Sequence, residues 1–235
     1  MKETAVENPI KRSPLLVMEL VGPAGAGKTT LSRALSLRSD KIQVGSEIEL
    51  RKLKYVPVFV HNALLLLPVI LHRSWHGRWF TWEELKALVY LKGWHGVLRQ
   101  EANQPGKAVL LDHGPVFKLA TLHEFGPESL KDPGYQPWWN NTFRQWASTL
   151  DVVIWLDAPD LILEKRINSR NQHHTVKGKS APETSQFLAR YRVSYEQILA
   201  KLKSFGGPVL FRFDTNQTPI EQIVDEVLLT VNRLS

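Results

Sequence analysis

The residues best suited to chemistry lie near the start of the chain, in the loop Gly22-Pro23-Ala24-Gly25-Ala26-Gly27-Lys28-Thr29. This loop matches the pattern G-x4-G-K-[S/T] at every position. Its glycines allow consecutive N–H groups to point at phosphate oxygens, and a helix that starts here adds the positive end of its dipole. Lys28 is placed to reach the outer phosphates and the Thr29 hydroxyl to bind Mg²⁺, with Thr30 as a further nucleotide contact. The pattern therefore predicts a phosphate-binding loop (P-loop) for ATP or GTP with Mg²⁺.

The alternative to a P-loop is a glycine-rich turn that matches the pattern by chance, and the sequence on either side of the loop distinguishes the two. The apolar run Leu15 to Val21 precedes the loop and predicts a strand, and the segment Thr29 to Leu37 follows it and predicts a helix. A strand before and a helix after are the context in which a P-loop occurs. The context therefore favours phosphate binding over a chance match.

A second candidate is Asp112, the acid that follows the apolar run from 108 to 111. In sheets of parallel strands, ligands bind at the carboxyl ends of the strands. There the Asp112 carboxylate would bind Mg²⁺, directly or through water, or would orient the attacking group. The alternative is that Asp112 caps the turn near Gly114 and Pro115. The P-loop upstream favours the functional interpretation.

The strands and helices that must position these residues alternate along the chain. Apolar runs predict strands at 15–21, 41–45, 108–111, 152–156 and 209–213, with helical segments between them and a last helix from 219. The region 46–104 is predicted to be mainly helical, with Thr81 as the N-cap of one helix. Continuous apolar strands indicate an α/β fold, in which helices cover both faces of a five-stranded parallel sheet. The length of 235 residues favours one domain, 15–235, after a loose tail at 1–14.

Composition narrows the class of protein further. Hydrophobic residues make up 43% and charged residues 23% of the chain, which is typical of a folded protein rather than a disordered one. The absence of cysteine excludes disulfides and thiolate metal sites and favours the cytoplasm. The most apolar stretch, Val56 to Leu71, is interrupted by Pro57 and Pro68 and is short for a membrane-spanning helix. A buried or substrate-facing helix is expected there instead.

The order of these motifs resembles that of the nucleoside and nucleotide kinases, particularly thymidylate kinase and the deoxynucleoside kinases. In these families the P-loop is followed by a strand with an acceptor-site acid, a strand ending in an acidic motif, an Arg-bearing lid and a last strand with a nucleotide-base loop. The chain from Leu15 to Leu234 can be laid on that order. The resemblance implies a three-layer P-loop NTPase fold, with a helical acceptor region at 46–104 and a lid at 160–182. It also implies transfer of the γ-phosphate of ATP to a small molecule.

The lid of this resemblance carries Arg166 and Arg170, after the run from Asp151 to Pro159. Four residues apart on a helix, the two arginines would share one face and close together over the transferring phosphate. The alternative is a solvated basic helix face, but the position after the fourth strand favours the functional interpretation. Lys177 and Lys179 in the adjoining loop would either attract phosphate or lie in solvent.

The resemblance places the adenine contact in the loop after the last strand. The candidate residues are Asp214, Thr215 and Asn216, with Gln217 beside them. Residues of these types before Pro219 are also ordinary turn and cap residues, and this alternative stays open.

The acceptor site departs from the resemblance in two respects. Deoxynucleoside kinases carry Glu-Pro after the second strand, whereas this chain has Glu47 without the proline. Glu47 is the candidate general base, and the alternative is an acid stabilised at a helix start. Thymidylate kinase follows its third-strand acid with an Arg that helps to bind an acceptor phosphate, whereas this chain has His113. A hydroxyl acceptor is therefore favoured over a phosphate.

Four tryptophans in the region 46–104 either line the acceptor pocket or belong to the core. They are Trp75, Trp79, Trp82 and Trp94.

Two other functions stay open. A nucleotide switch or ATPase that acts with a protein partner would use the same P-loop but release phosphate to water; the lid arginines and Glu47 favour the kinase. The formal charge of +7 suggests a kinase for nucleic-acid ends, but no recognised nucleic-acid module is found and phosphorylated substrates also attract basic residues. The sequence leaves the choice of ATP or GTP open, and also the oligomeric state, a homodimer included.

Overall fold

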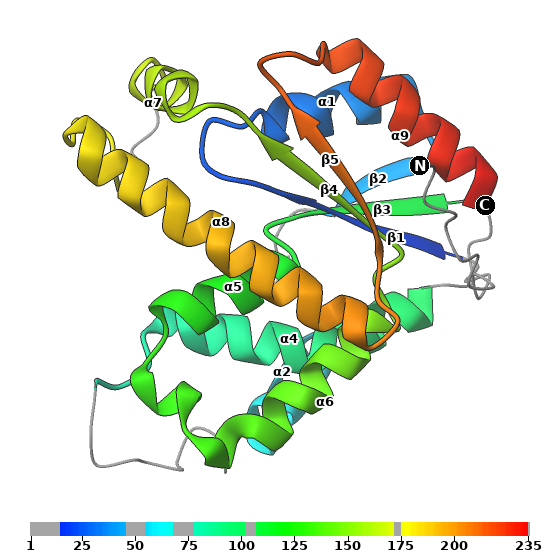
Figure 1. The fold of residues 1–235 in the computed structure, drawn as a ribbon. Helices are drawn as coiled ribbons and strands as arrows, with labels where there is room; N and C mark the ends of the chain where they lie inside the picture. The colour runs from blue at the N-terminus through cyan, green and yellow to red at the C-terminus, as the bar shows by residue number, and fades with distance from the viewer. Residues whose placement is uncertain (1–14, 46–54, 68–77, 102–106, 172–174, 235) are drawn as a thin grey trace, which may run out of the picture.

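The computed structural model describes residues 15–45, 55–67, 78–101, 107–171 and 175–234 (Figure 1). Five parallel strands form one sheet in the order β2-β3-β1-β4-β5. Their bounds are β1 (Leu15–Val21), β2 (Ile42–Gly45), β3 (Lys107–Asp112), β4 (Val152–Asp157) and β5 (Val209–Asp214). The predicted α/β fold with a five-stranded parallel sheet is confirmed, and each strand lies within one residue of its predicted bounds.

Helices cover both faces of this sheet (Figure 1). On one face lie α1 (Lys28–Arg38) and α9 (Ile220–Leu234), and on the other lie α4 (Trp82–Glu101), α5 (Pro115–Phe125) and α8 (Ala181–Ser204). Three other helices pack against these or extend past the sheet: α2 (Val56–Leu65) on α4, α6 (Gln136–Ala147) on α4 and α8, and α7 (Asp160–Asn168) beyond the carboxyl ends of β4 and β5. The short 3-10 helices η2 (Glu128–Lys131) and η3 (Pro133–Tyr135) join α5 to α6.

The two helical layers explain why the strands are apolar at successive positions. In β1, Leu16, Met18 and Leu20 belong to the core under α1 and α9. Leu15, Val17 and Val21 belong to the core under the opposite layer. Because successive side chains of a strand point to opposite faces, a strand covered on both sides has no solvent-facing position.

In the described part of the region 46–104, residues 56–65 and 82–101 are helical, and the prediction of a mainly helical region agrees with this. The α4 helix begins with reciprocal hydrogen bonds: the Glu84 N–H donates to Thr81 Oγ1 (3.3 Å), and the Thr81 N–H donates to the Glu84 carboxylate (2.7 Å). Thr81 is thus the N-cap that the sequence predicted. Among the residues that the structure describes, no helix has the length and apolar character needed to cross a membrane.

Glu19 is a buried acid in β1, on the face of the sheet covered by α5. It is 0% exposed, and its carboxyl oxygens accept the N–H groups of Val116 (2.8 Å) and Phe117 (3.0 Å) at the start of α5. Burial raises the pKa of Glu19 to about 8, although these two hydrogen bonds oppose the rise. Glu19 therefore joins β1 to the start of α5 and fixes the turn that follows β3.

Glu19 is expected to make the protein less stable as pH rises from about 6 to about 8. Its pKa is raised on folding, so in this window the folded chain keeps a proton that the unfolded chain has released. For one proton the free energy of unfolding falls by at most about 1.4 kcal/mol per pH unit. The window lies above the pKa of about 6 to which burial raises Asp151, so Asp151 adds little. Urea unfolding of Glu19→Gln should therefore depend less on pH, and an equally steep decline in the variant would contradict the assignment.

Candidate active site

The P-loop joins β1 to α1 at the carboxyl edge of the sheet, in the strand–loop–helix context that the sequence predicted. Three of its glycines have positive φ: Gly22 (138°), Gly25 (83°) and Gly27 (95°). A Cβ atom on Gly22 would lie 2.0 Å from the main-chain oxygen of Leu156 in β4. Position 22 therefore requires glycine for two reasons: the backbone conformation there and the close approach of β4.

Gly22→Ala and Gly27→Ala should differ in their effect on stability. Gly22→Ala adds a backbone clash to an unfavourable φ, so we expect it to lower the free energy of unfolding by more than about 3 kcal/mol. A Cβ on Gly27 meets no atom within 4 Å, so only the conformational cost of about 1–2 kcal/mol applies. Urea denaturation of the two variants checks the order, and equal losses would contradict the role of the Leu156 contact.

Lys28 opens α1 and extends back over the P-loop. Its Nζ donates hydrogen bonds to the main-chain oxygens of Gly22 (2.6 Å) and Pro23 (3.0 Å). Burial lowers the pKa of the Lys28 ammonium to about 8; the charge of Asp112 opposes this change and that of Arg170 reinforces it. The charges of Asp112 and Arg170 therefore both act on the Lys28 ammonium.

Asp112 ends β3, paired in register with Leu20 of β1 just before the P-loop. Its Oδ1 atom is buried and accepts no hydrogen bond from the described residues, and His113 Nδ1 lies 3.7 Å from it. His113 has a positive φ of 55°, a strained conformation of the kind that occurs at functional sites. Two oxygen atoms here suit Mg²⁺: Asp112 Oδ1 and the hydroxyl of the exposed Thr29. Mg²⁺ takes few protein ligands when phosphates supply its other ligands. Within the described ranges, no group of three or more His, Cys, Asp or Glu residues could hold a metal alone.

Arg166 in α7 connects the P-loop with the loop after β5. Its Nη1 donates to Thr215 Oγ1 (2.9 Å) and to the Gly25 oxygen (3.3 Å), and its Nη2 donates to the Thr215 oxygen (3.1 Å). The sequence predicted nucleotide contacts in all three places. The structure brings these places together, with Arg166 at their centre.

The prediction that Arg166 and Arg170 share one face of a helix was wrong. The α7 helix ends at Asn168, and the Arg170 N–H donates to the Ile167 oxygen (3.3 Å) in a tighter turn past the helix end. Asn168 and Ser169 favour such an end because their side chains compete for backbone hydrogen bonds. The two arginines therefore do not share a helix face. Arg170 nevertheless lies close enough to Lys28 to lower its pKa, and its main-chain oxygen accepts a hydrogen bond from Lys177.

The loop after β5 is a tight turn whose first residue is Asp214. Asp214 Oδ1 accepts the Asn216 N–H (2.8 Å), and the Asp214 main-chain oxygen accepts the N–H groups of Gln217 and Thr218. Asp214 thus has the turn-forming role that the sequence left open. Thr215 instead contacts the end of β4: its N–H (2.8 Å) and its hydroxyl (3.1 Å) donate to the Asp157 oxygen.

Part of the predicted acceptor site falls outside the described residues, namely Glu47 and Trp75. Of the other tryptophans in that region, Trp94 stacks on Tyr90 (5.8 Å between ring centroids), so it belongs to the packing of α4. Trp79 and Trp82 are 54% and 70% exposed and are therefore not core residues. The ring of His113, which follows Asp112, packs against the Phe117 ring of α5, with 4.5 Å between the ring centroids.

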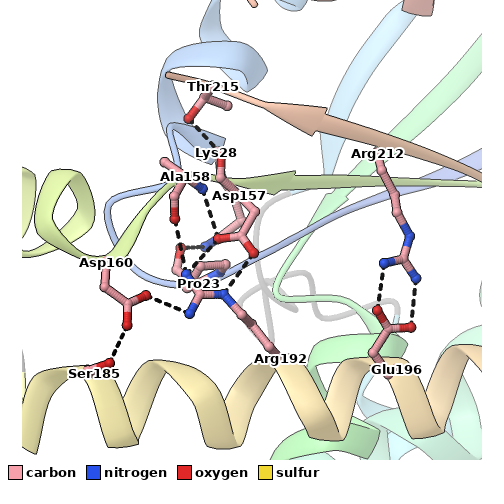
Figure 2. Close-up of polar contacts among 10 residues, drawn as sticks. All are labelled: Pro23, Lys28, Asp157, Ala158, Asp160, Ser185, Arg192, Glu196, Arg212 and Thr215. Carbon is pink, nitrogen blue, oxygen red and sulfur yellow. Dashed lines mark hydrogen bonds and ion pairs between the residues drawn. The ribbon is translucent and has the colours of Figure 1, made fainter. Parts of the chain in front are cut away.

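Sequence reasoning missed a polar cluster where β4, α7 and α8 meet (Figure 2). Its residues are Asp157, Asp160, Ser185 and Arg192, and it borders a groove of about 560 Å³ beside β5. Asp157 and Arg192 are 35 residues apart in the chain, so no local spacing links them. The one available signal was the pair of acids that flank Ala158-Pro159 at the end of a predicted strand.

Comparisons with known proteins bear on the fold. No protein-family model matches the sequence, and no curated protein matches it either. Among solved structures, this chain is similar to deoxyadenosine kinase from M. mycoides with the products dCMP and a flexible dCDP bound, with a TM-score of 0.51 and 15% identity over 93% of this chain and 100% of that one. The same enzyme with dATP bound gives a TM-score of 0.50 and 16% identity over 92% and 99% of the two chains. With dCTP bound, the values are 0.50 and 14% over 93% and 100%. The chain thus shares its fold with this deoxyadenosine kinase, which confirms the α/β fold that the resemblance predicted.

Proposed function

We propose that this protein is a kinase that uses ATP and Mg²⁺ to phosphorylate a hydroxyl group of a nucleoside or a similar small molecule. The observation that carries the proposal is the convergence of Lys28, Asp112 and Arg166 on one P-loop. Lys28 and Arg166 donate to main-chain oxygens of that loop, and the charge of Asp112 acts on Lys28. One triphosphate bound there would meet two cations and one carboxylate. The fold shared with deoxyadenosine kinase supports a nucleoside as the acceptor.

In the proposed reaction, the acceptor oxygen forms a bond to the γ-phosphorus while the bond from that phosphorus to the β–γ bridging oxygen breaks. The electron pair of the broken bond stays on ADP, and the hydroxyl proton passes to a carboxylate. Lys28 and the P-loop N–H groups stabilise the charge that grows on the phosphate oxygens. Mg²⁺, held by Thr29 and Asp112, would neutralise further charge on the β- and γ-phosphates.

The carboxylate that accepts the proton is proposed to be Glu47, and Asp112 is the second candidate. The Lys28 ammonium, which contacts the Gly22 and Pro23 oxygens, would bind the phosphates of the nucleotide. Arg166 would stay on the Thr215 side and hold the nucleotide against the P-loop, while Arg170 would add positive charge near Lys28. Binding and orientation therefore account for most of the proposed rate acceleration.

The test is a panel of acceptors incubated with Mg²⁺ and ATP or GTP labelled on the γ-phosphate. The panel includes ribonucleosides, deoxynucleosides, nucleoside monophosphates, DNA ends and a reaction without any acceptor. We expect label on a nucleoside and little release to water. Labelled phosphate that appears equally without an acceptor would identify an ATPase, and label on DNA ends alone would identify a nucleic-acid end kinase. Either result would contradict the proposal.

A further inference from the structure

Arg192, on α8, donates hydrogen bonds to Asp157, Ala158 and Asp160, where β4 connects to α7 (Figure 2). Its Nε and Nη2 donate to the two carboxylate oxygens of Asp157 (2.7 and 2.9 Å). Its Nη1 donates to Asp160 (2.6 Å), and Nη2 also donates to the Ala158 oxygen (3.0 Å). One guanidinium group therefore contacts the last residue of β4, the first residue of α7 and the connection between them.

The first turn of α7 depends on these contacts. Its N-cap, Pro159, makes no side-chain capping hydrogen bond. Asp160 accepts hydrogen bonds from Arg192 and from Ser185, both on α8. Burial alone would raise the pKa of Asp160, but these two hydrogen bonds together with the charge of Arg192 lower it, so Asp160 is ionised at neutral pH. A helix of nine residues is too short to be stable by itself, so its position depends on its contacts with α8 and on the core around Leu163 and Ile167.

The same turn is connected to the nucleotide site by main-chain contacts. The Asp157 oxygen accepts the N–H and the hydroxyl of Thr215, and the Thr215 hydroxyl accepts a hydrogen bond from Arg166. Arg166 stands six residues after Asp160 on α7 and also donates to the Gly25 oxygen of the P-loop. A shift at the start of α7 would therefore displace the guanidinium of Arg166 from both Thr215 and the P-loop.

We propose that Arg192 is a positioning residue for the donor nucleotide: by holding Asp157 and Asp160 it sets the direction of α7 and keeps Arg166 against the P-loop. This inference rests on the proposed function, because it gives Arg166 the role of holding ATP. Arg192 acts through Arg166 and does not itself touch the nucleotide.

The chain offers a matched control on the same helix. Glu196, one turn after Arg192, pairs with Arg212 of β5 through two hydrogen bonds (2.5 and 2.7 Å), as Figure 2 shows. This pair also joins α8 to the sheet, and the Arg212 guanidinium lies over the Trp155 ring (4.4 Å). The Arg212 side chain is 50% exposed, against 24% for Arg192, and among the described residues its hydrogen bonds go to Glu196 and not to the turn from 157 to 160. Loss of the Arg212 pair therefore removes an α8–sheet contact without releasing α7.

The experiment compares Arg192→Gln with Arg212→Gln by calorimetric titration of ATP with Mg²⁺, at a temperature where both variants are folded. We expect Arg192→Gln to weaken ATP binding by about tenfold and Arg212→Gln to change it by less than about twofold. With a nucleoside acceptor, Arg192→Gln should raise KM for ATP and leave KM for the nucleoside unchanged. A purely structural role would lower the amount of active protein and change neither KM.

A double-mutant cycle with Arg166→Ala tests the route of the effect. If Arg192 acts through Arg166, Arg192→Gln should add little to the loss already caused by Arg166→Ala. Asp160→Asn removes one contact of the cluster and replaces Arg192→Gln in the comparison if the latter does not fold.

Normal ATP affinity in the Arg192 or Asp160 variant, or fully additive losses in the cycle, would overturn the inference and leave the proposed function intact. ATP binding by the wild type without transfer to any acceptor would overturn the proposed function alone. Failure of the wild type to bind ATP with Mg²⁺ would overturn both.

Discussion

Lys28→Ala is expected to lower the rate of phosphoryl transfer by about 10²–10³-fold, the cost of removing one preorganised charge from a transition state. The Lys28 ammonium is held within the P-loop by the Gly22 and Pro23 oxygens, so little motion is needed to bring it to the phosphates. Burial makes its charge more effective, because the surrounding protein screens it less than water does. The measurement is transfer of γ-labelled phosphate to the acceptor that the panel selects.

The matched control for this variant is Lys86→Ala. Lys86 lies on α4 and pairs with Glu83 three residues earlier (2.6 Å), a surface contact of small energy. It should keep the wild-type rate. A Lys28→Ala enzyme that is folded and as active as the Lys86 variant would contradict the assignment of the P-loop as the site of reaction.

Asp112→Asn is expected to lower the rate by about 10²-fold or more and to raise the Mg²⁺ concentration needed for half-maximal activity. The amide keeps the shape of the side chain but loses the charge that Mg²⁺ and the Lys28 ammonium both respond to. Because Oδ1 accepts no hydrogen bond from the described residues, the substitution should change stability little. Rates measured across a Mg²⁺ titration separate weaker metal binding from a slower chemical step.

Asp225→Asn serves as the control for loss of one negative charge, since Asp225 is exposed and pairs with Arg38 at the surface (2.8 Å). Its Mg²⁺ dependence should match that of the wild type. If Asp112→Asn also keeps the wild-type Mg²⁺ dependence and rate, Asp112 is a capping residue of the turn after β3 and not a metal ligand.

Features that depend on neighbouring residues were predictable from the sequence. The strands were found because β1, β3 and β4 lie between two helical layers, and burial on both faces makes most of their residues apolar, with Glu19 of β1 as an exception. The P-loop was found because its glycines, Lys28 and Thr29 act through local backbone geometry at fixed spacing. The Thr81 cap is local in the same sense, since its partner Glu84 is three residues away.

Features that depend on partners distant in the chain were not predictable. Glu19 contacts Val116, 97 residues later, and an acid in an apolar strand gives no sign of which helix it will join. The contact of Arg192 with Asp157 crosses 35 residues and depends on how α8 packs on the sheet. The end of α7 before Arg170 was missed for another reason. The four-residue spacing of Arg166 and Arg170 suits a continuous helix, but the weak helix propensity of Asn168 and Ser169 favours an end of α7 before Arg170.

The most direct measurement is a calorimetric titration of the folded protein with ATP and with GTP, each in the presence and absence of Mg²⁺. We predict saturable uptake of one of these nucleotides per chain, tighter with the metal than without it, and much weaker in Lys28→Ala. If neither triphosphate produces a binding isotherm with the metal present, this loop does not hold a polyphosphate and the kinase proposal is wrong.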